Sequence, residues 1–99
     1  MQGVYTIPQL KSVLYPLFDA YGIRHAVLFG SYGKGIATEN SDIDLLVDSG
    51  LRGLKFIGFL DDVQQALRKE VDLFDVTHIE AGSPIDQEIR QTGVPFYEK

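Results

Sequence analysis

The chain has 99 residues, 44% of them hydrophobic, and contains no cysteine, which excludes disulfide bonds and zinc sites built from thiolates. Its 14 acidic and 9 basic residues leave a net charge of −5, which argues against direct binding of nucleic acid through a basic surface. No apolar run approaches the roughly 20 residues of a membrane span, and no signal-peptide pattern opens the chain. We therefore expect one cytoplasmic domain over residues 1–99 that has no membrane contact.

The N-terminal region predicts one amphipathic helix. Thr6 and Gln9 form a capping-box pattern, and apolar residues then recur at helical spacing as far as Tyr21. Pro16 lies inside this stripe and is expected to kink the helix, since proline removes one backbone hydrogen bond. Gly22 is a suitable stop, because glycine readily adopts the left-handed conformation that ends many helices.

The centre of the chain predicts two strands with a short helix between them. Apolar runs predict strands over residues 23–29 and 42–47, and residues 31–35 are expected to form the short helix. The intervening residues 37–41 are polar and typical of a turn. Residues 54–69 then carry apolar side chains at helical spacing and predict a second long helix.

The C-terminal region predicts a third strand, a helix and a short edge strand. The apolar run at residues 71–76 predicts the strand, and Ser83 followed by Pro84 is typical of a helix N-terminus. Gly93 is expected to end this helix, and residues 94–97 are expected to form the edge strand, where proline is tolerated. The order of helices and strands is typical of an α/β or α+β fold.

Two aspartates at the head of the second strand carry the strongest functional signal. Asp42 and Asp44 are two residues apart, so both carboxylates point to the same face of a strand. Two like charges beside a buried strand are costly unless a cation compensates them, and Mg²⁺ prefers carboxylate and phosphate oxygens as ligands. Gly30 and Ser31, which ten residues separate from Asp42, form a turn in which N–H groups and a hydroxyl can approach a phosphate. The two segments together predict a site for a metal ion and a nucleotide.

A third carboxylate is expected from the third strand. Asp72 and Asp75 are three residues apart, so they face opposite sides of the strand and only one of them can join Asp42 and Asp44. Asp72 shares its face with apolar residues and needs a partner for its charge, whereas Asp75 lies nearer the strand end and is expected to reach solvent. These considerations favour Asp72 as the third acid and leave Asp75 as the alternative.

The glycine-rich segment from Leu28 to Gly35 and the acids that follow it resemble a known family. The segment Leu-Phe-Gly-Ser-Tyr-Gly-Lys-Gly, the Asp-x-Asp pair and the later carboxylate are similar to those of the DNA polymerase β nucleotidyltransferase superfamily. Within it, the chain resembles the minimal nucleotidyltransferases (MNT), which are antitoxins paired with HEPN-domain toxins. The MNT segment usually reads Leu-Phe-Gly-Ser-Tyr-Ala-Arg-Gly, so Gly33 and Lys34 replace an alanine and an arginine.

The resemblance implies the palm-like nucleotidyltransferase fold of polymerase β, a small mixed β-sheet packed by helices, in one minimal domain. It implies that three acids bind two Mg²⁺ ions and take part in catalysis: Asp42, Asp44 and Asp72. It also implies that the triphosphate of ATP is held by Gly30, Ser31 and Lys34. The activity implied is the transfer of AMP from ATP to a tyrosine of a partner HEPN toxin, with which the chain is expected to form an oligomeric complex.

Two other functions are compatible with the sequence. The chain could be a catalytically silent antitoxin that neutralises its partner by binding alone, although such a binder has no need of three clustered acids. It could also transfer a nucleotide to a small molecule, as aminoglycoside nucleotidyltransferases do, although those usually carry an extra domain for the acceptor. Tyr32 stays open as well, since it is compatible with stacking on a base and with packing in the core.

Overall fold

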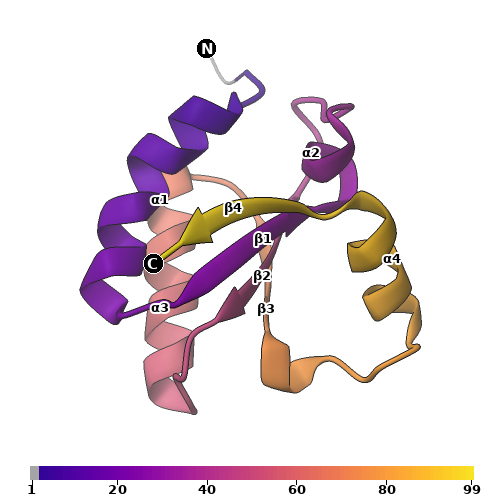
Figure 1. Cartoon of the computed structure of the whole chain (residues 1–99). Helices are drawn as coiled ribbons and strands as arrows, with labels where there is room; N and C mark the ends of the chain where they lie inside the picture. Colours follow the sequence, from indigo (N-terminus) through magenta and orange to yellow (C-terminus); the bar gives the residue numbers. More distant parts are fainter. Residues whose placement is uncertain (1–2) are drawn as a thin grey trace.

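A four-stranded mixed sheet organises residues 3–99, which are the residues that the computed structural model describes (Figure 1). The elements follow one another as α1 (Ile7–Tyr21), β1 (His25–Phe29), α2 (Gly30–Lys34), β2 (Ile43–Asp48), α3 (Leu54–Leu67), β3 (Val71–Asp75), the 3₁₀ turn η1 (Val76–His78), α4 (Pro84–Thr92) and β4 (Val94–Glu98). Across the sheet the order is β3-β2-β1-β4, with β2 parallel to β3 and β1 antiparallel to both of its neighbours. The mixed sheet packed by helices is therefore confirmed. Within this range no helix has both the length and the apolar character that crossing a membrane requires.

The first helix, α1, begins and ends as its sequence predicts. The N–H of Gln9 donates to Oγ1 of Thr6 (3.2 Å) and the N–H of Thr6 donates to Oε1 of Gln9 (2.8 Å), which completes the capping box. Gly22 ends the helix with a φ of +71°. The helix continues past Pro16 as far as Tyr21.

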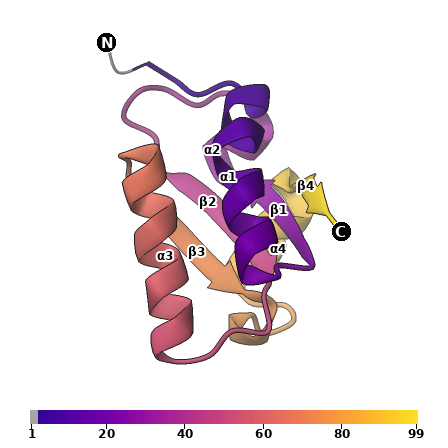
Figure 2. The same ribbon diagram turned by 90° about the vertical axis from the view of Figure 1, so that its left-hand side faces the viewer.

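One face of the sheet forms the core. Alternate residues of β2 are fully buried beneath α1 and α3, which lie side by side across this face (Figure 2). The large side chains that fill this layer are Ile43, Leu45 and Val47 from β2, Leu10, Leu14 and Phe18 from α1, and Phe59, Val63 and Leu67 from α3. Because side chains alternate along a strand, Asp44 and Leu46 face the opposite side of the sheet.

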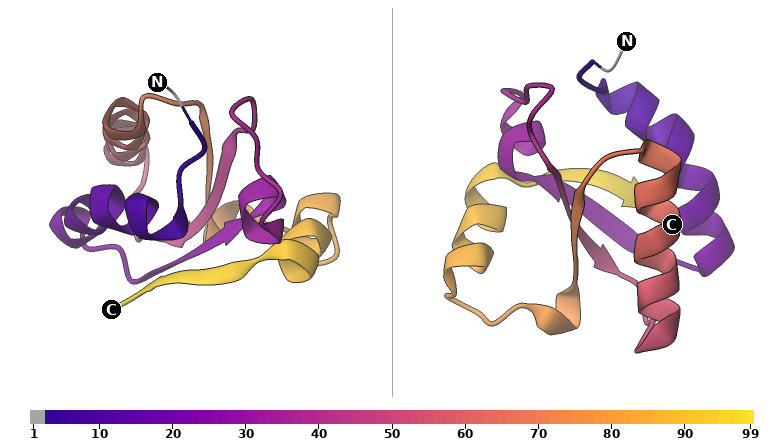
Figure 3. Two further views of the ribbon diagram at one scale, coloured as in Figure 1. Left: turned by 90° about the horizontal axis from the view of Figure 1, so that it is seen from above. Right: turned by 180° about the vertical axis from the view of Figure 1, so that it is seen from behind.

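The chain crosses to the opposite face after β3. η1 follows at once, and α4 then lies on the side of the sheet away from α1 and α3 before β4 pairs with β1 at the far edge (Figure 3). The sequence predicts a strand as far as Val76, but the strand ends one residue earlier, at Asp75. The reason is that the Asp75 side chain accepts a hydrogen bond from the N–H of Thr77 (3.0 Å) and so caps η1.

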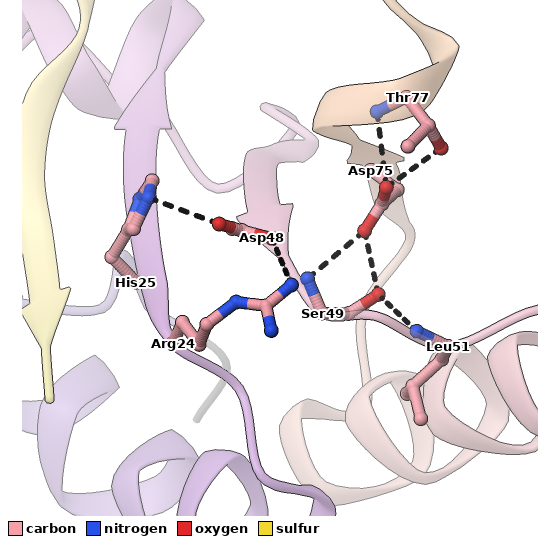
Figure 4. A network of polar contacts seen from close by, with 7 residues as sticks. All are labelled: Arg24, His25, Asp48, Ser49, Leu51, Asp75 and Thr77. Atoms are coloured by element: carbon pink, nitrogen blue, oxygen red, sulfur yellow. Dashed lines mark hydrogen bonds and ion pairs between the residues drawn. The ribbon is translucent and has the colours of Figure 1, made fainter.

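Asp75 is held by donors on both of its carboxylate oxygens (Figure 4). Oδ1 accepts from the N–H (3.0 Å) and the hydroxyl (2.6 Å) of Ser49, and Oδ2 accepts from the N–H (3.0 Å) and the hydroxyl (2.7 Å) of Thr77. Since Asp75 is only 2% exposed, the expectation that it reaches solvent is wrong. Burial acts to raise the pKa of Asp75, but the hydrogen bonds from Ser49 and Thr77 outweigh it and lower the pKa to about 2.

We expect Asp75→Ala to lower the free energy of unfolding by about 2–3 kcal/mol, because it leaves the donors of Ser49 and Thr77 without their acceptor. The folded pKa lies below the ordinary value of 3.8, so this contribution is present above about pH 4 and is lost as the pH falls towards 2. Urea unfolding of the wild type and the variant at neutral and acidic pH measures both effects.

The control for this prediction is Asp72→Ala, on the exposed face of the same strand. This variant is expected to leave the free energy of unfolding unchanged or higher, because it removes a charge from a crowded group of acids. Equal losses of stability for Asp72→Ala and Asp75→Ala would contradict the role given to the hydrogen bonds of Asp75.

Candidate functional site

The predicted acids lie where β1 ends and where β2 and β3 begin. In the register of the sheet, Asp44 is paired with Phe29 of β1 on one side and with Asp72 of β3 on the other. Asp72 is exposed while its two strand neighbours are buried, so it faces the side of the sheet away from α1 and α3. Asp75 faces the core side instead. The structure therefore brings Asp72, and not Asp75, next to Asp44.

Asp42 lies one residue before β2 and is exposed. Within residues 3–99, no three His, Asp or Glu side chains are arranged so that they could hold a metal ion by themselves. Mg²⁺, however, is usually bound by one or two carboxylates and completes its coordination with substrate phosphates and water. The carboxylates at this corner of the sheet, where β1 ends and β2 and β3 begin, form a donor set of that kind.

The acids at this corner affect one another electrostatically. Burial and a hydrogen bond with the Asp72 carboxyl raise the pKa of Asp44 to about 7, and the charges of Asp72, Glu88 and Asp42 add to the shift. Among residues 3–99, no positively charged side chain contributes to the pKa of Asp44. Oxygen donors and a shortage of positive charge are what a divalent cation requires, so these residues fit the metal that the resemblance implies.

Gly30 allows the turn between β1 and α2 to approach Asp44. Its φ is +70°, and a Cβ at this position would overlap Oδ2 of Asp44. The N–H of Gly30 donates to Oγ1 of Thr92 (2.9 Å), so this amide already has its partner. Of the other residues predicted to hold the triphosphate, Ser31 is half-buried in the first turn of α2 and Lys34 is exposed in its last turn.

Two residues of α4 belong to this corner, and sequence reasoning did not identify them. The buried Thr92 accepts from Gly30 and donates to the carbonyl oxygen of Glu88 (2.8 Å). Glu88 lies four residues before Thr92, hence on the same face of the helix, and its charge acts on Asp44. A Cβ at Gly33 would overlap the carbonyl oxygen of Thr92, which explains a glycine where the MNT segment usually has alanine. No sequence pattern signals these contacts, because Gly30 and Thr92 are 62 residues apart.

The alternative left open for Tyr32 is resolved in favour of packing. Its side chain is 5% exposed and belongs to the hydrophobic core. Its hydroxyl is buried and has no hydrogen-bond partner in the part of the chain that the structure describes. A ring enclosed in this way is not available for stacking on a base.

A sequence profile of the family described as "Polymerase beta, Nucleotidyltransferase" matches residues 13–99. The chain belongs to this family. One relative, the protein adenylyltransferase MntA of Thermococcus cleftensis, is 34% identical over 85 residues, which cover 78% of this chain and 84% of the relative. Another, a candidate protein adenylyltransferase of Methanocaldococcus jannaschii, is 32% identical over 75 residues, which cover 74% of this chain and 81% of the relative.

Solved structures share the fold of this nucleotidyltransferase. A chain from a crystal structure of a toxin–antitoxin pair with AMP-PNP gives a TM-score of 0.71 at 24% identity, covering 90% of this chain and 73% of that chain. A chain from the complex of the MNT antitoxin with the tri-AMPylated HEPN toxin of Shewanella oneidensis gives 0.68 at 20% identity, covering 95% and 74%. These likenesses confirm the fold that the resemblance implies.

We expect Gly30→Ala to be more destabilising than Gly35→Ala. Both glycines have a left-handed backbone, with φ of +70° and +75°, but only at position 30 would a Cβ overlap Asp44; nothing lies within 4 Å at position 35. Gly35→Ala should cost about 1–2 kcal/mol for the backbone conformation alone. Gly30→Ala should cost about 1–3 kcal/mol more, because the Asp44 carboxylate has to move. Urea unfolding of the metal-free protein measures the difference.

The same two substitutions in an Asp44→Ala background provide the control. Removal of the carboxylate takes away the two atoms that a Cβ at position 30 would approach most closely, and the Cβ of residue 44 lies at 3.5 Å, which is an ordinary contact. The excess cost of Gly30→Ala should then disappear. An excess that persists in this background would show that Asp44 does not determine the need for glycine at this position.

Proposed function

We propose that this chain transfers AMP from ATP to a tyrosine of a HEPN-domain toxin and thereby acts as the antitoxin of that toxin, in the cytoplasm, where ATP is available. The proposal rests on one observation above all: Asp44 and Asp72 are direct neighbours beside the turn at Gly30 in a chain of the nucleotidyltransferase family. The relatives support a protein acceptor, since their names describe them as protein adenylyltransferases. The antitoxin of similar fold that is solved with an AMPylated HEPN toxin supports the choice of partner.

The residues proposed to hold two Mg²⁺ ions are Asp42, Asp44 and Asp72. When bound, the ions would supply positive charge to the attacking and leaving oxygens of an in-line displacement at phosphorus. The raised pKa of Asp44 is compatible with this assignment, because it reflects burial first and then the carboxylates brought close to Asp44.

The remaining steps are proposed for side chains of this corner and of the acceptor. The tyrosine hydroxyl oxygen attacks the α-phosphorus of ATP, the bond from that phosphorus to the bridging oxygen breaks, and pyrophosphate leaves. Asp72, exposed on the face of the sheet away from α1 and α3, accepts the proton of the tyrosine. The hydroxyl of Ser31 and the ammonium group of Lys34 bind triphosphate oxygens and stabilise the charge of the departing pyrophosphate.

The first test separates catalysis from neutralisation by binding. With ATP and Mg²⁺, we expect a small fraction of this protein to inactivate an excess of toxin, because an enzyme turns over. Mass spectrometry should show one or more added AMP groups on a tyrosine of the toxin. Neutralisation that needs no ATP and is complete only at equal stoichiometry would indicate the silent binder. Transfer to a small molecule with no modification of the toxin would indicate the other alternative.

The second test uses two aspartates of one strand. Asp44→Asn is expected to reduce AMP transfer by about 100-fold or more, the scale of a missing catalytic group, without unfolding the metal-free protein. Asp48→Asn, on the same face of β2 but in an ion pair with Arg24 (2.9 Å), is the matched control and should transfer at the wild-type rate. Equal rates for wild type and Asp44→Asn would rule out the proposed metal site.

A further inference from the structure

A second surface feature lies at the end of the sheet opposite the acids. A hollow of about 720 Å³ opens between the start of α3 and η1, and its walls include the side chains of Leu51, Leu54, Phe56, Ile57, Arg52 and His78. We call it the α3 hollow. It follows the C-terminal ends of β2 and β3, whereas Asp44 and Asp72 lie near the N-terminal ends of the same strands. From Asp44 to Asp48 the strand alone spans about 13 Å, so the two features are separate.

The α3 hollow exposes apolar side chains that do not pack in the hydrophobic core. Leu54 is 88% exposed, more than any other large apolar side chain of residues 3–99, and Ile57, three residues later on the same face, is 57% exposed. The core side of α3 is already formed by Phe59 and Val63, which are fully buried. Clustered exposure of this kind is typical of a surface that another molecule covers.

The fully charged side chain that lines the hollow is positive, although the chain as a whole is acidic. The chain carries a net charge of −5, yet within residues 3–99 the hollow is lined by no Asp or Glu. Arg52 lines it, Lys55 lies in the adjoining first turn of α3, and neither has an ion-pair partner in the described part of the chain. Gly53 provides no side-chain cap and the first turn holds no acid, so the helix N-terminus adds to the positive potential.

We propose that the α3 hollow is an exosite that binds an acidic, apolar segment of the protein that this chain adenylylates. Large aliphatic side chains of the segment would contact Leu54 and Ile57, and its carboxylates would lie near Arg52 and Lys55. The inference rests on the proposed function for the identity of the partner, the HEPN toxin. Binding of the partner at a site remote from the reacting atoms stabilises the substrate complex and the transition state equally. It therefore lowers KM for the toxin and leaves kcat unchanged. It also leaves the corner that contains Asp44 open to ATP and to the acceptor tyrosine.

The experiment uses the toxin as the probe and two double variants. Leu54→Ser/Ile57→Ser removes the apolar contacts, and Arg52→Glu/Lys55→Glu reverses the charge. We expect each to raise the Kd for the toxin by about tenfold or more, measured by calorimetry without ATP. In the transfer assay each should raise KM for the toxin and leave kcat and KM for ATP unchanged. Wild-type affinity should fall as salt is raised, and the salt dependence should be much weaker in the charge-reversed variant.

Ile36→Ser is the matched control, because Ile36 is 64% exposed but lies in the loop after α2. It should bind the toxin as the wild type does. Unchanged affinity in both double variants, a loss in Ile36→Ser as large as theirs, or no binding by the wild type would overturn the exosite. Because all these substitutions are at exposed positions, the melting temperature should stay within about 2 °C of the wild type, which excludes unfolding as the cause.

The outcomes for the exosite and for the enzyme are distinguishable. If the double variants weaken binding but the wild type transfers no AMP, the exosite stands and the proposed function fails. If the wild type transfers AMP and the double variants bind and react as it does, the proposed function stands and the exosite fails.

Discussion

The carboxylate of Asp44 occupies the space that a side chain at position 30 would fill, and much of the structure depends on this contact. It requires a left-handed glycine at the end of β1, which turns the chain directly into α2. The turn is then fixed from the other side by Thr92, whose hydroxyl binds the N–H of Gly30. The end of β1, the start of β2 and the end of α4 thus meet at Gly30.

Two aspartates of adjacent strands show how strongly the surroundings of a carboxyl group determine its pKa. Asp44 is paired with Asp72 and Val47 with Asp75 along the same ladder, so the two environments lie three positions apart. Asp75 has four donors and a pKa of about 2, while Asp44 has other acids around it and a pKa of about 7. The first carboxylate is a structural anchor that stays charged. The second is partly buried beside other acids, which disfavours its charged form.

Local patterns in the sequence predict most of the fold. The capping box at Thr6, the alternation in β2 and the glycine stops are read from neighbouring residues, and the structure contains all of them. The face of Asp72 also follows from strand periodicity. What the sequence does not reveal are contacts between distant segments: Ser49 on Asp75, which buries an acid expected at the surface, and Thr92 on Gly30. The hollow beside Leu54 is likewise a product of tertiary packing, because the helical stripe of α3 by itself does not show which apolar residues stay uncovered.

The link between Gly30 and Thr92 has a consequence for synthesis of the chain. The acids and the glycine turn leave the ribosome early, but the residue that fixes the turn comes 62 positions later, and β4 must then pair with β1. Contacts of such high sequence separation form late, because the intervening chain has to be ordered first. Until α4 is synthesised, the chain carries the acids without the hydroxyl that binds the N–H of Gly30. The turn at Gly30 is thus completed by a segment that is synthesised long after the acids.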